Sequence, residues 1–255
     1  REARVPDLRS RRAGAGAAAF GMKAVHFSWR WFRRGLAIFV LLLLAWQGWY
    51  LGWVVWWKFV NPSTTSFMSL RLDELREKDP RAELKQQWVP YERISANLKR
   101  AVVAAEDAKF SEHEGFDWEG IQKALEKNQK KGKIVAGGST ISQQLAKNLF
   151  LSASKTPWRK AQEAVITLML EAVLDKRRIL EIYLNVVEWG NGVFGAEAAA
   201  RHYYGTSAAQ VSAEQAARLA VLLPNPRKFG RLPGSPYLAA RSQVILGRMN
   251  SADIP

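Results

Sequence analysis

The feature that most constrains this chain is an uncharged stretch of 23 residues at positions 35–57, GLAIFVLLLLAWQGWYLGWVVWW. At about 1.5 Å rise per residue, a helix of this length spans a hydrocarbon core about 30 Å thick. Tryptophans mark both ends, as in the aromatic belts of membrane interfaces: Trp29, Trp31, Trp53, Trp56 and Trp57. We therefore expect one transmembrane helix over residues 35–57.

Two other interpretations of this stretch are a cleaved signal peptide and a buried helix of a soluble core. The apolar stretch is long for a signal sequence, and no small-residue cleavage site follows in VVWWKFVNP. A soluble core helix seldom carries so many tryptophans. Arg30, Arg33 and Arg34 precede the stretch, so the positive-inside rule places the N-terminus in the cytoplasm and the rest outside it.

The charge of the chain is uneven. Residues 1–34 form a basic segment with nine Lys and Arg against Glu2 and Asp7. Its first part, residues 1–21, precedes a natural-looking start at Met22 and is either a disordered extension or non-native sequence. The net charge of +15 calls for a polyanionic partner: nucleic acid, anionic lipid or a phosphate-bearing substrate. Without cysteine, disulfides and thiolate zinc sites are excluded.

After the anchor, residues 58–90 are expected to form a connector and residues 91–255 one all-α domain. Ser95 can cap a helix in which Leu98, Val102 and Ala105 recur at helical spacing. Further helices are expected near 117–130, 140–150, 157–174, 176–187, 195–203, 212–223 and 236–249, separated by Gly, Pro and Ser breaks. No stretch shows the alternation of a strand.

The motif EDAKFSEHEGFD begins with a candidate catalytic carboxylate, Glu106. If the helix continues toward Gly115, Phe110 and His113 share its face at i+4 and i+7. A carboxylate near a helix C-terminus among apolar neighbours has its pKa raised, which suits a general base. The alternative is a surface glutamate. Asp107 is expected to orient its surroundings, and His113 to be structural, since no metal-ligand spacing is present.

Two downstream motifs suggest an anion site. In GGSTISQQLAKNLF, Ser139 is the expected N-cap, and Gln143 shares a helix face with Lys147. In SKTPWRKAQE, Thr156 and Pro157 suit the N-cap and first position of a helix. Arg159 and Lys160 then lie in the first turn, with Lys155 just outside. Cations at a helix N-terminus interact unfavourably with the helix dipole. A bound anion such as phosphate would offset this cost, which suggests an anion site here. The alternatives are a capped amphipathic helix and a surface ion pair of Arg159 and Lys160 with Glu163.

These motifs, followed by ILEIYLNVVEWG and GAEAAARHYYG, resemble in order the signature set of the family 51 peptidoglycan glycosyltransferases, from about residue 89 to 226. A membrane anchor without a second catalytic domain resembles the monofunctional branch. The resemblance implies a lysozyme-like helical lobe with a smaller membrane-proximal jaw lobe. It also implies polymerisation of lipid II into glycan strands with inversion.

The resemblance assigns roles residue by residue. Glu106 is the base that deprotonates the GlcNAc 4-hydroxyl of the acceptor, and Glu163 is the second essential carboxylate, which positions the cations or aids departure of the leaving group. Undecaprenyl pyrophosphate is the leaving group, and the cations of the two downstream motifs hold its negative charge. The implied substrate-binding residues are Asp107, Phe110, His113, Ser139, Thr140, Gln143, Gln144, Lys147, Asn148, Lys155, Arg159 and Lys160.

No metal site and no required cofactor are expected, although a divalent cation, Mg or Mn, could assist with the pyrophosphate. Expected partners are lipid II, the growing strand, anionic membrane lipids and cell-wall synthesis or division proteins, but no nucleic acid. The chain is placed in the bacterial inner membrane with a periplasmic catalytic domain, active in cell-wall biogenesis and cell shape. The alternatives are a lytic enzyme that cleaves peptidoglycan and a non-catalytic membrane-anchored scaffold.

Overall fold

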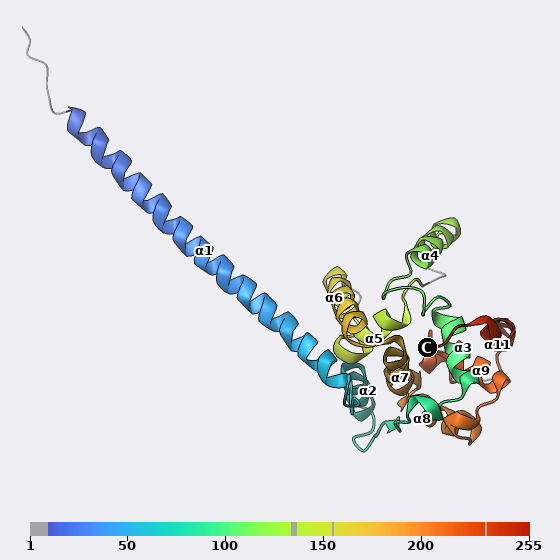
Figure 1. The fold of residues 1–255 in the computed structure, drawn as a ribbon. Helices are drawn as coiled ribbons and strands as arrows, with labels where there is room; N and C mark the ends of the chain where they lie inside the picture. Colours follow the sequence, from blue (N-terminus) through green and yellow to red (C-terminus); the bar gives the residue numbers. More distant parts are fainter. Residues whose placement is uncertain (1–9, 134–136, 155, 233) are drawn as a thin grey trace, which may run out of the picture. The chain divides into compact units, whose positions relative to one another are not determined.

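The computed structural model describes residues 10–133, 137–154, 156–232 and 234–255, with side chains from Trp29 onward. The chain divides into two compact units, residues 1–50 and residues 51–255. One continuous helix, α1 (Ser10–Trp57), forms the described part of the first unit and contributes its last two turns to the second (Figure 1).

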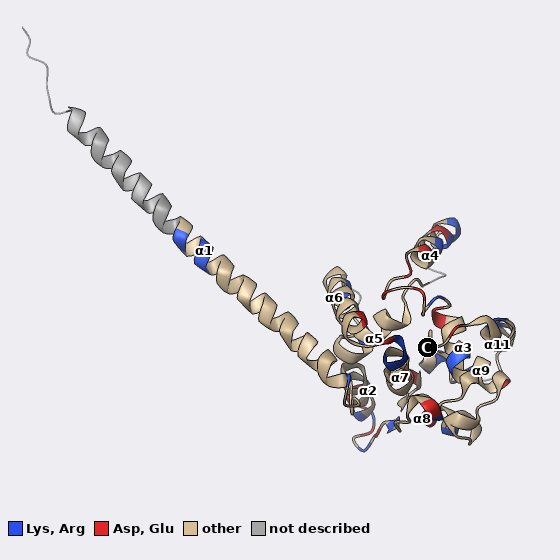
Figure 2. Cartoon of the chain, in the orientation of Figure 1, with Lys and Arg blue, Asp and Glu red and all other residues tan. Residues whose placement is uncertain are grey.

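The apolar helix predicted at residues 35–57 is the C-terminal half of α1. Residues 29–57 are long and apolar enough to cross a membrane, and 6% of the most apolar window is buried. Lys and Arg side chains occur at the start of this span and none follows Arg34 within it (Figure 2). An apolar helix surface that the protein leaves uncovered is consistent with burial in lipid.

The second unit is predominantly helical, as predicted. Its first helices are α2 (Ser66–Arg76), α3 (Ala96–Glu106), α4 (Trp118–Lys131), α5 (Ile141–Phe150) and α6 (Pro157–Val173). They are followed by α7 (Lys176–Val186), α8 (Ala196–Tyr204), α9 (Ala213–Leu222), α10 (Pro226–Phe229) and α11 (Pro236–Arg248), with short 3₁₀ turns at Tyr91–Arg93, Ala208–Gln210 and Met249–Ser251.

Polar caps set the starts of these helices. Ser95 and Thr156 accept bonds from the third backbone N–H of α3 and α6, as expected, and Pro157 occupies the first position of α6. The predicted cap at Ser139 is wrong by one residue. Thr140 caps α5 in a reciprocal capping box with Gln143, because its hydroxyl reaches the N–H of Gln143 while the Gln143 side chain reaches back.

The helices pack in two groups. Helix α3 lies against α9 and α11, and α5 lies against α2, α6 and α7. Helix α4 stands apart in Figure 1, and none of its residues is buried. The catalytic candidates lie where the two groups meet, because α3 ends with Glu106 and α5 carries Gln144 and Lys147.

A small sheet was missed by the sequence analysis. Strands β1 (Lys85–Gln86), β2 (Glu188–Gly190) and β3 (Val193–Phe194) form it in the order β1-β3-β2, with β1 parallel and β2 antiparallel to β3. Strands of two or three residues are too short to show an alternating pattern.

Candidate active site

Glu106 is the last residue of α3. Its Oε2 accepts a hydrogen bond of 2.8 Å from Nε2 of Gln144, and Oε1 of Gln144 accepts one of 3.0 Å from the hydroxyl of Tyr183. Burial raises the pKa of Glu106 above its ordinary value, although the Gln144 bond and the nearby charges of Lys147 and Arg241 oppose the rise. These two part-buried hydrogen bonds, the Gln144–Tyr183 relay, orient the carboxylate of Glu106, which is a candidate general base.

The helix of Glu106 ends earlier than expected. The prediction that it continues toward Gly115 is wrong, because Asp107 leaves the helical conformation and caps the end of α3. Phe110 and His113 therefore do not share a helix face with Glu106. They lie in the following turns, with Phe110 fully buried and the His113 ring edge-on to it at 6.4 Å between centroids.

Asp107 joins α3 to the start of α5. Its Oδ2 accepts a 3.0 Å bond from the N–H of Ile141, and its Oδ1 lies 2.9 Å from Nε2 of His113. The hydroxyl of Thr140 donates a 2.7 Å bond to the carbonyl of Gly115. These contacts hold the start of α5 next to the residues that follow Glu106.

A cleft of about 190 Å³ opens beside Glu106. Its walls include Gly137, Gly138 and Ser139 of the glycine turn and, from α11, Arg241 and Arg248. A Cβ at Gly138 would lie 3.1 Å from the Cα of Ile121, so glycine lets this turn approach α4 closely. The two arginines escaped the sequence analysis because they lie in no motif and far from Glu106 along the chain.

The second half of the site is a cationic cluster at the start of α6. The carboxylate of Glu163, 3% exposed, accepts bonds from Arg159 at 2.5 Å and from Lys160. Nζ of Lys160 also lies 3.5 Å from the hydroxyl of Ser139, which lines the cleft. The buried Nε of Arg159 has no hydrogen-bond partner among the described atoms. The cluster is thus adjacent to the cleft.

Lys147 lies on α5, three residues after Gln144. Burial lowers the pKa of its ammonium, and the carboxylates of Glu163 and Glu106 both oppose that shift. The Lys147 charge therefore interacts with both the candidate base and the carboxylate of the cationic cluster.

Three further residues predicted to bind substrate are not found at the cleft: two are buried in α5, and one lies outside the described residues. Gln143 and Asn148 are buried in α5, and the Gln143 amide is used in the capping box. Lys155 lies outside the described residues. Tyr183 orients Gln144 and was recognisable from the sequence only as part of the motif ILEIYLNVVEWG. Within the described ranges, no group of three or more His, Cys, Asp or Glu side chains could hold a metal ion.

A helical domain with an oriented carboxylate of raised pKa near a cationic cluster has the groups that an enzyme of glycosyl transfer needs: a base and a site for an anionic leaving group. The model of a family described as Transglycosylase matches residues 73–250. The chain belongs to the transglycosylase family, whose lysozyme-like helical domain fits the fold.

Curated relatives agree over most of the chain. A protein of Dechloromonas aromatica is 65% identical over 226 residues, which cover 89% of this chain and 98% of the relative. Proteins of Nitrosospira multiformis and Azoarcus sp. are 62% and 64% identical over 226 and 227 residues, again 89% of this chain and 98% of each relative. All three are named biosynthetic peptidoglycan transglycosylase.

Proposed function

We propose that this chain is a membrane-anchored peptidoglycan glycosyltransferase that polymerises lipid II into glycan strands. The reaction joins the GlcNAc 4-hydroxyl of an acceptor to the anomeric carbon of a donor MurNAc, with inversion and loss of undecaprenyl pyrophosphate. The single observation that carries the proposal is the pairing of Glu106, held by the Gln144–Tyr183 relay, with the cationic cluster beside it.

Glu106 acts as the general base. Its raised pKa makes it a stronger base than an ordinary glutamate, and the Gln144 amide keeps one oxygen engaged so that the other can face the acceptor hydroxyl. As the hydroxyl attacks the anomeric carbon, its proton passes to the free carboxylate oxygen. Asp107 takes no proton; it holds the start of α5 in register with Glu106.

The cations stabilise the leaving group. The C–O bond to the pyrophosphate breaks as negative charge develops on the phosphate oxygens, and in this proposal Lys147, Arg159 and Lys160 supply the positive charge that stabilises it. Lys155 joins this set by its position in the sequence. Glu163 orients the cations through its two ion pairs. A Mg or Mn ion would add positive charge at the leaving pyrophosphate, and the described residues supply no dedicated ligand set for it.

The location follows from the anchor. We place α1 across the bacterial inner membrane with its arginine-flanked end in the cytoplasm and the catalytic unit in the periplasm. The basic N-terminal segment would face anionic lipid headgroups. Cell-wall synthesis or division proteins are expected neighbours.

The alternative of a lytic enzyme also uses a glutamate of raised pKa. Cleavage of mature glycan releases no pyrophosphate, so a lytic enzyme has no use for a cationic cluster next to the cleft. The cationic cluster therefore favours a synthetic enzyme over a lytic one. The oriented carboxylate of Glu106 favours an enzyme of either kind over a non-catalytic scaffold.

Polymerisation of lipid II by the full chain and by Glu106→Gln tests the proposal. Loss of a general base costs about 10²- to 10⁴-fold in rate, so the variant should fall by that factor. Glu114→Gln is the matched control, since Glu114 is an exposed acid of the same motif. Unchanged turnover by Glu106→Gln, or cleavage of mature glycan without lipid II turnover, would overturn the proposal.

A further inference from the structure

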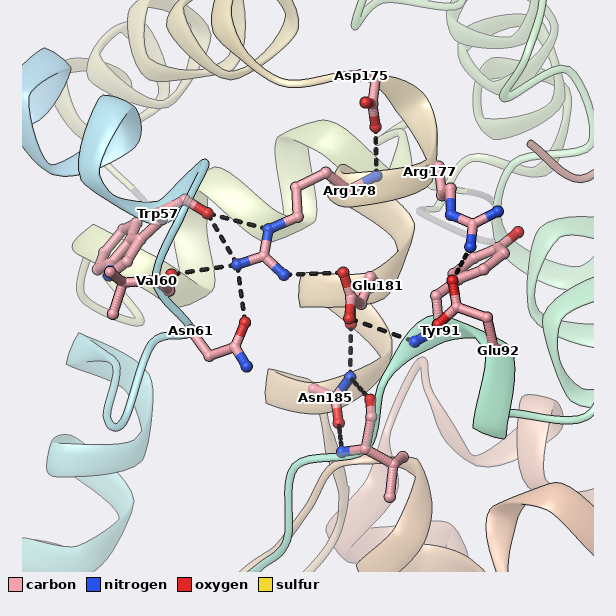
Figure 3. Close-up of polar contacts among 11 residues, drawn as sticks. Trp57, Val60, Asn61, Tyr91, Glu92, Asp175, Arg177, Arg178, Glu181 and Asn185 are labelled. Carbon is pink, nitrogen blue, oxygen red and sulfur yellow. Dashed lines mark hydrogen bonds and ion pairs between the residues drawn. The ribbon is translucent and has the colours of Figure 1, made fainter.

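The end of the membrane helix is fixed to α7 by one arginine (Figure 3). Nε and Nη2 of Arg178 donate to the carbonyl of Trp57 at 3.0 and 2.9 Å. Nη2 also reaches the carbonyl of Val60 at 3.1 Å and Oδ1 of Asn61 at 2.8 Å. The last carbonyls of a helix lack partners within it, and a cation there complements the helix dipole. Arg178 therefore caps the end of α1 from another helix.

The guanidinium of Arg178 is itself held in place. Its Nη1 donates a 2.8 Å bond to Oε2 of Glu181, one turn further along α7, and Oε1 of Glu181 accepts a 3.2 Å bond from the N–H of Tyr91. The Arg178 side chain is 14% exposed. A planar guanidinium fixed on one side by a carboxylate presents its remaining donors in a defined direction.

The same end of α1 touches the two helices of the catalytic relay. The ring of Trp57 lies on that of Phe150, the last residue of α5, with 4.9 Å between centroids. Helix α5 carries Gln144, and α7 carries both Arg178 and Tyr183. One residue at the end of the membrane span therefore contacts both elements that orient Glu106.

We propose that Arg178 is a positioning residue that binds the segment from Trp57 to Asn61 to α7 and so sets where the catalytic cleft stands relative to bilayer-held substrate. This inference rests on the proposed function. Donor and acceptor are both lipid-linked, so their reacting sugars lie at a limited distance from the bilayer. Catalysis then needs Glu106 at a matching distance, and a displacement of about 1 Å can cost up to about 10²-fold in rate.

Polymerisation by the full chain, measured in lipid vesicles and in detergent micelles, separates this role from a general structural one. Arg178→Gln should lose about tenfold or more in vesicles and stay within about twofold of wild type in micelles, where the substrate has no fixed plane to match. Arg177→Gln is the matched control: Arg177 neighbours Arg178 but pairs with Glu92 and stacks on Tyr91. It should leave the vesicle-to-micelle ratio of rates unchanged.

Asn61→Ala serves as a second variant that leaves α7 intact. It removes one acceptor of Arg178 and should lower the same ratio by less than Arg178→Gln does. The double variant should fall no further than Arg178→Gln alone, because both changes break one network. Equal losses in vesicles and micelles, or full vesicle activity of Arg178→Gln, would refute the positioning role. Inactivity of the wild type in both media would instead refute the proposed function.

Discussion

Gly115 is the backbone position at which a single methyl group should be most informative. Its φ of +87° lies in the left-handed region, and a Cβ there would lie 2.8 Å from Cγ2 of Thr167 and 3.1 Å from Cγ of Glu171. Alanine costs about 1–2 kcal/mol for this backbone conformation. Forcing a methyl against α6 adds about 1–3 kcal/mol of overpacking. We therefore expect Gly115→Ala to lower the free energy of unfolding by about 2–5 kcal/mol.

Gly205 supplies the matched control. Its φ is +63°, and a Cβ at this position would have no atom within 4 Å, so Gly205→Ala should carry only the backbone cost of about 1–2 kcal/mol. The assay compares urea unfolding midpoints of the two variants in detergent by circular dichroism, together with polymerisation rates. The carbonyl of Gly115 holds Thr140, so only Gly115→Ala should also slow catalysis. Equal midpoints for the two variants would show that the space behind Gly115 is not closed.

Two further predictions concern charges of the site. Burial raises the pKa of Glu106 in the folded state, so the unfolded chain loses this proton at a lower pH than the folded chain does. The free energy of unfolding therefore falls as the pH rises from the unfolded pKa to the folded pKa. Above the folded pKa both states are ionised and this fall is complete. Glu106→Gln should accordingly unfold at a higher temperature than wild type at neutral pH, with the difference shrinking in acid; a melting series across pH checks the sign. Arg159→Gln should lower the free energy of unfolding by about 1.5–3 kcal/mol because its partner Glu163 is buried, whereas Lys160→Gln, 47% exposed, should lower it by under about 1 kcal/mol. Thermal melts and donor KM values should show weaker donor binding in both variants but a marked stability loss only at Arg159.

The helices were predictable because their signals are local. Apolar spacing located α3, and the caps at Ser95 and Thr156 were recognised from residue type alone. The cap of α5 was predicted wrongly because two adjacent residues could both serve as the N-cap. Ser139 and Thr140 are both good caps, and the choice was made by the carbonyl of Gly115, which lies 25 residues away in the chain.

The candidate site was predictable only where a motif carried it. Glu106 stands in a motif and lines the cleft, and Glu163 holds Arg159 and Lys160 in a cluster that reaches Ser139 of that cleft. Arg241 reaches that cleft from α11 through packing of α11 on α3, which no local pattern records. The role of Tyr183 likewise depends on Gln144, an amide on another helix. The domain boundaries at residues 58 and 91 stay predictions.

The two ion pairs of Glu163 have a consequence for how the enzyme finishes a cycle. A carboxylate that already neutralises Arg159 and Lys160 competes with any phosphate for the same donors. Once the diphosphate departs, these two cations have a partner to return to, so they do not hold the product by charge alone. In the proposed reaction, such an internal competitor would lower the affinity for the released diphosphate and shorten the time for which it stays bound.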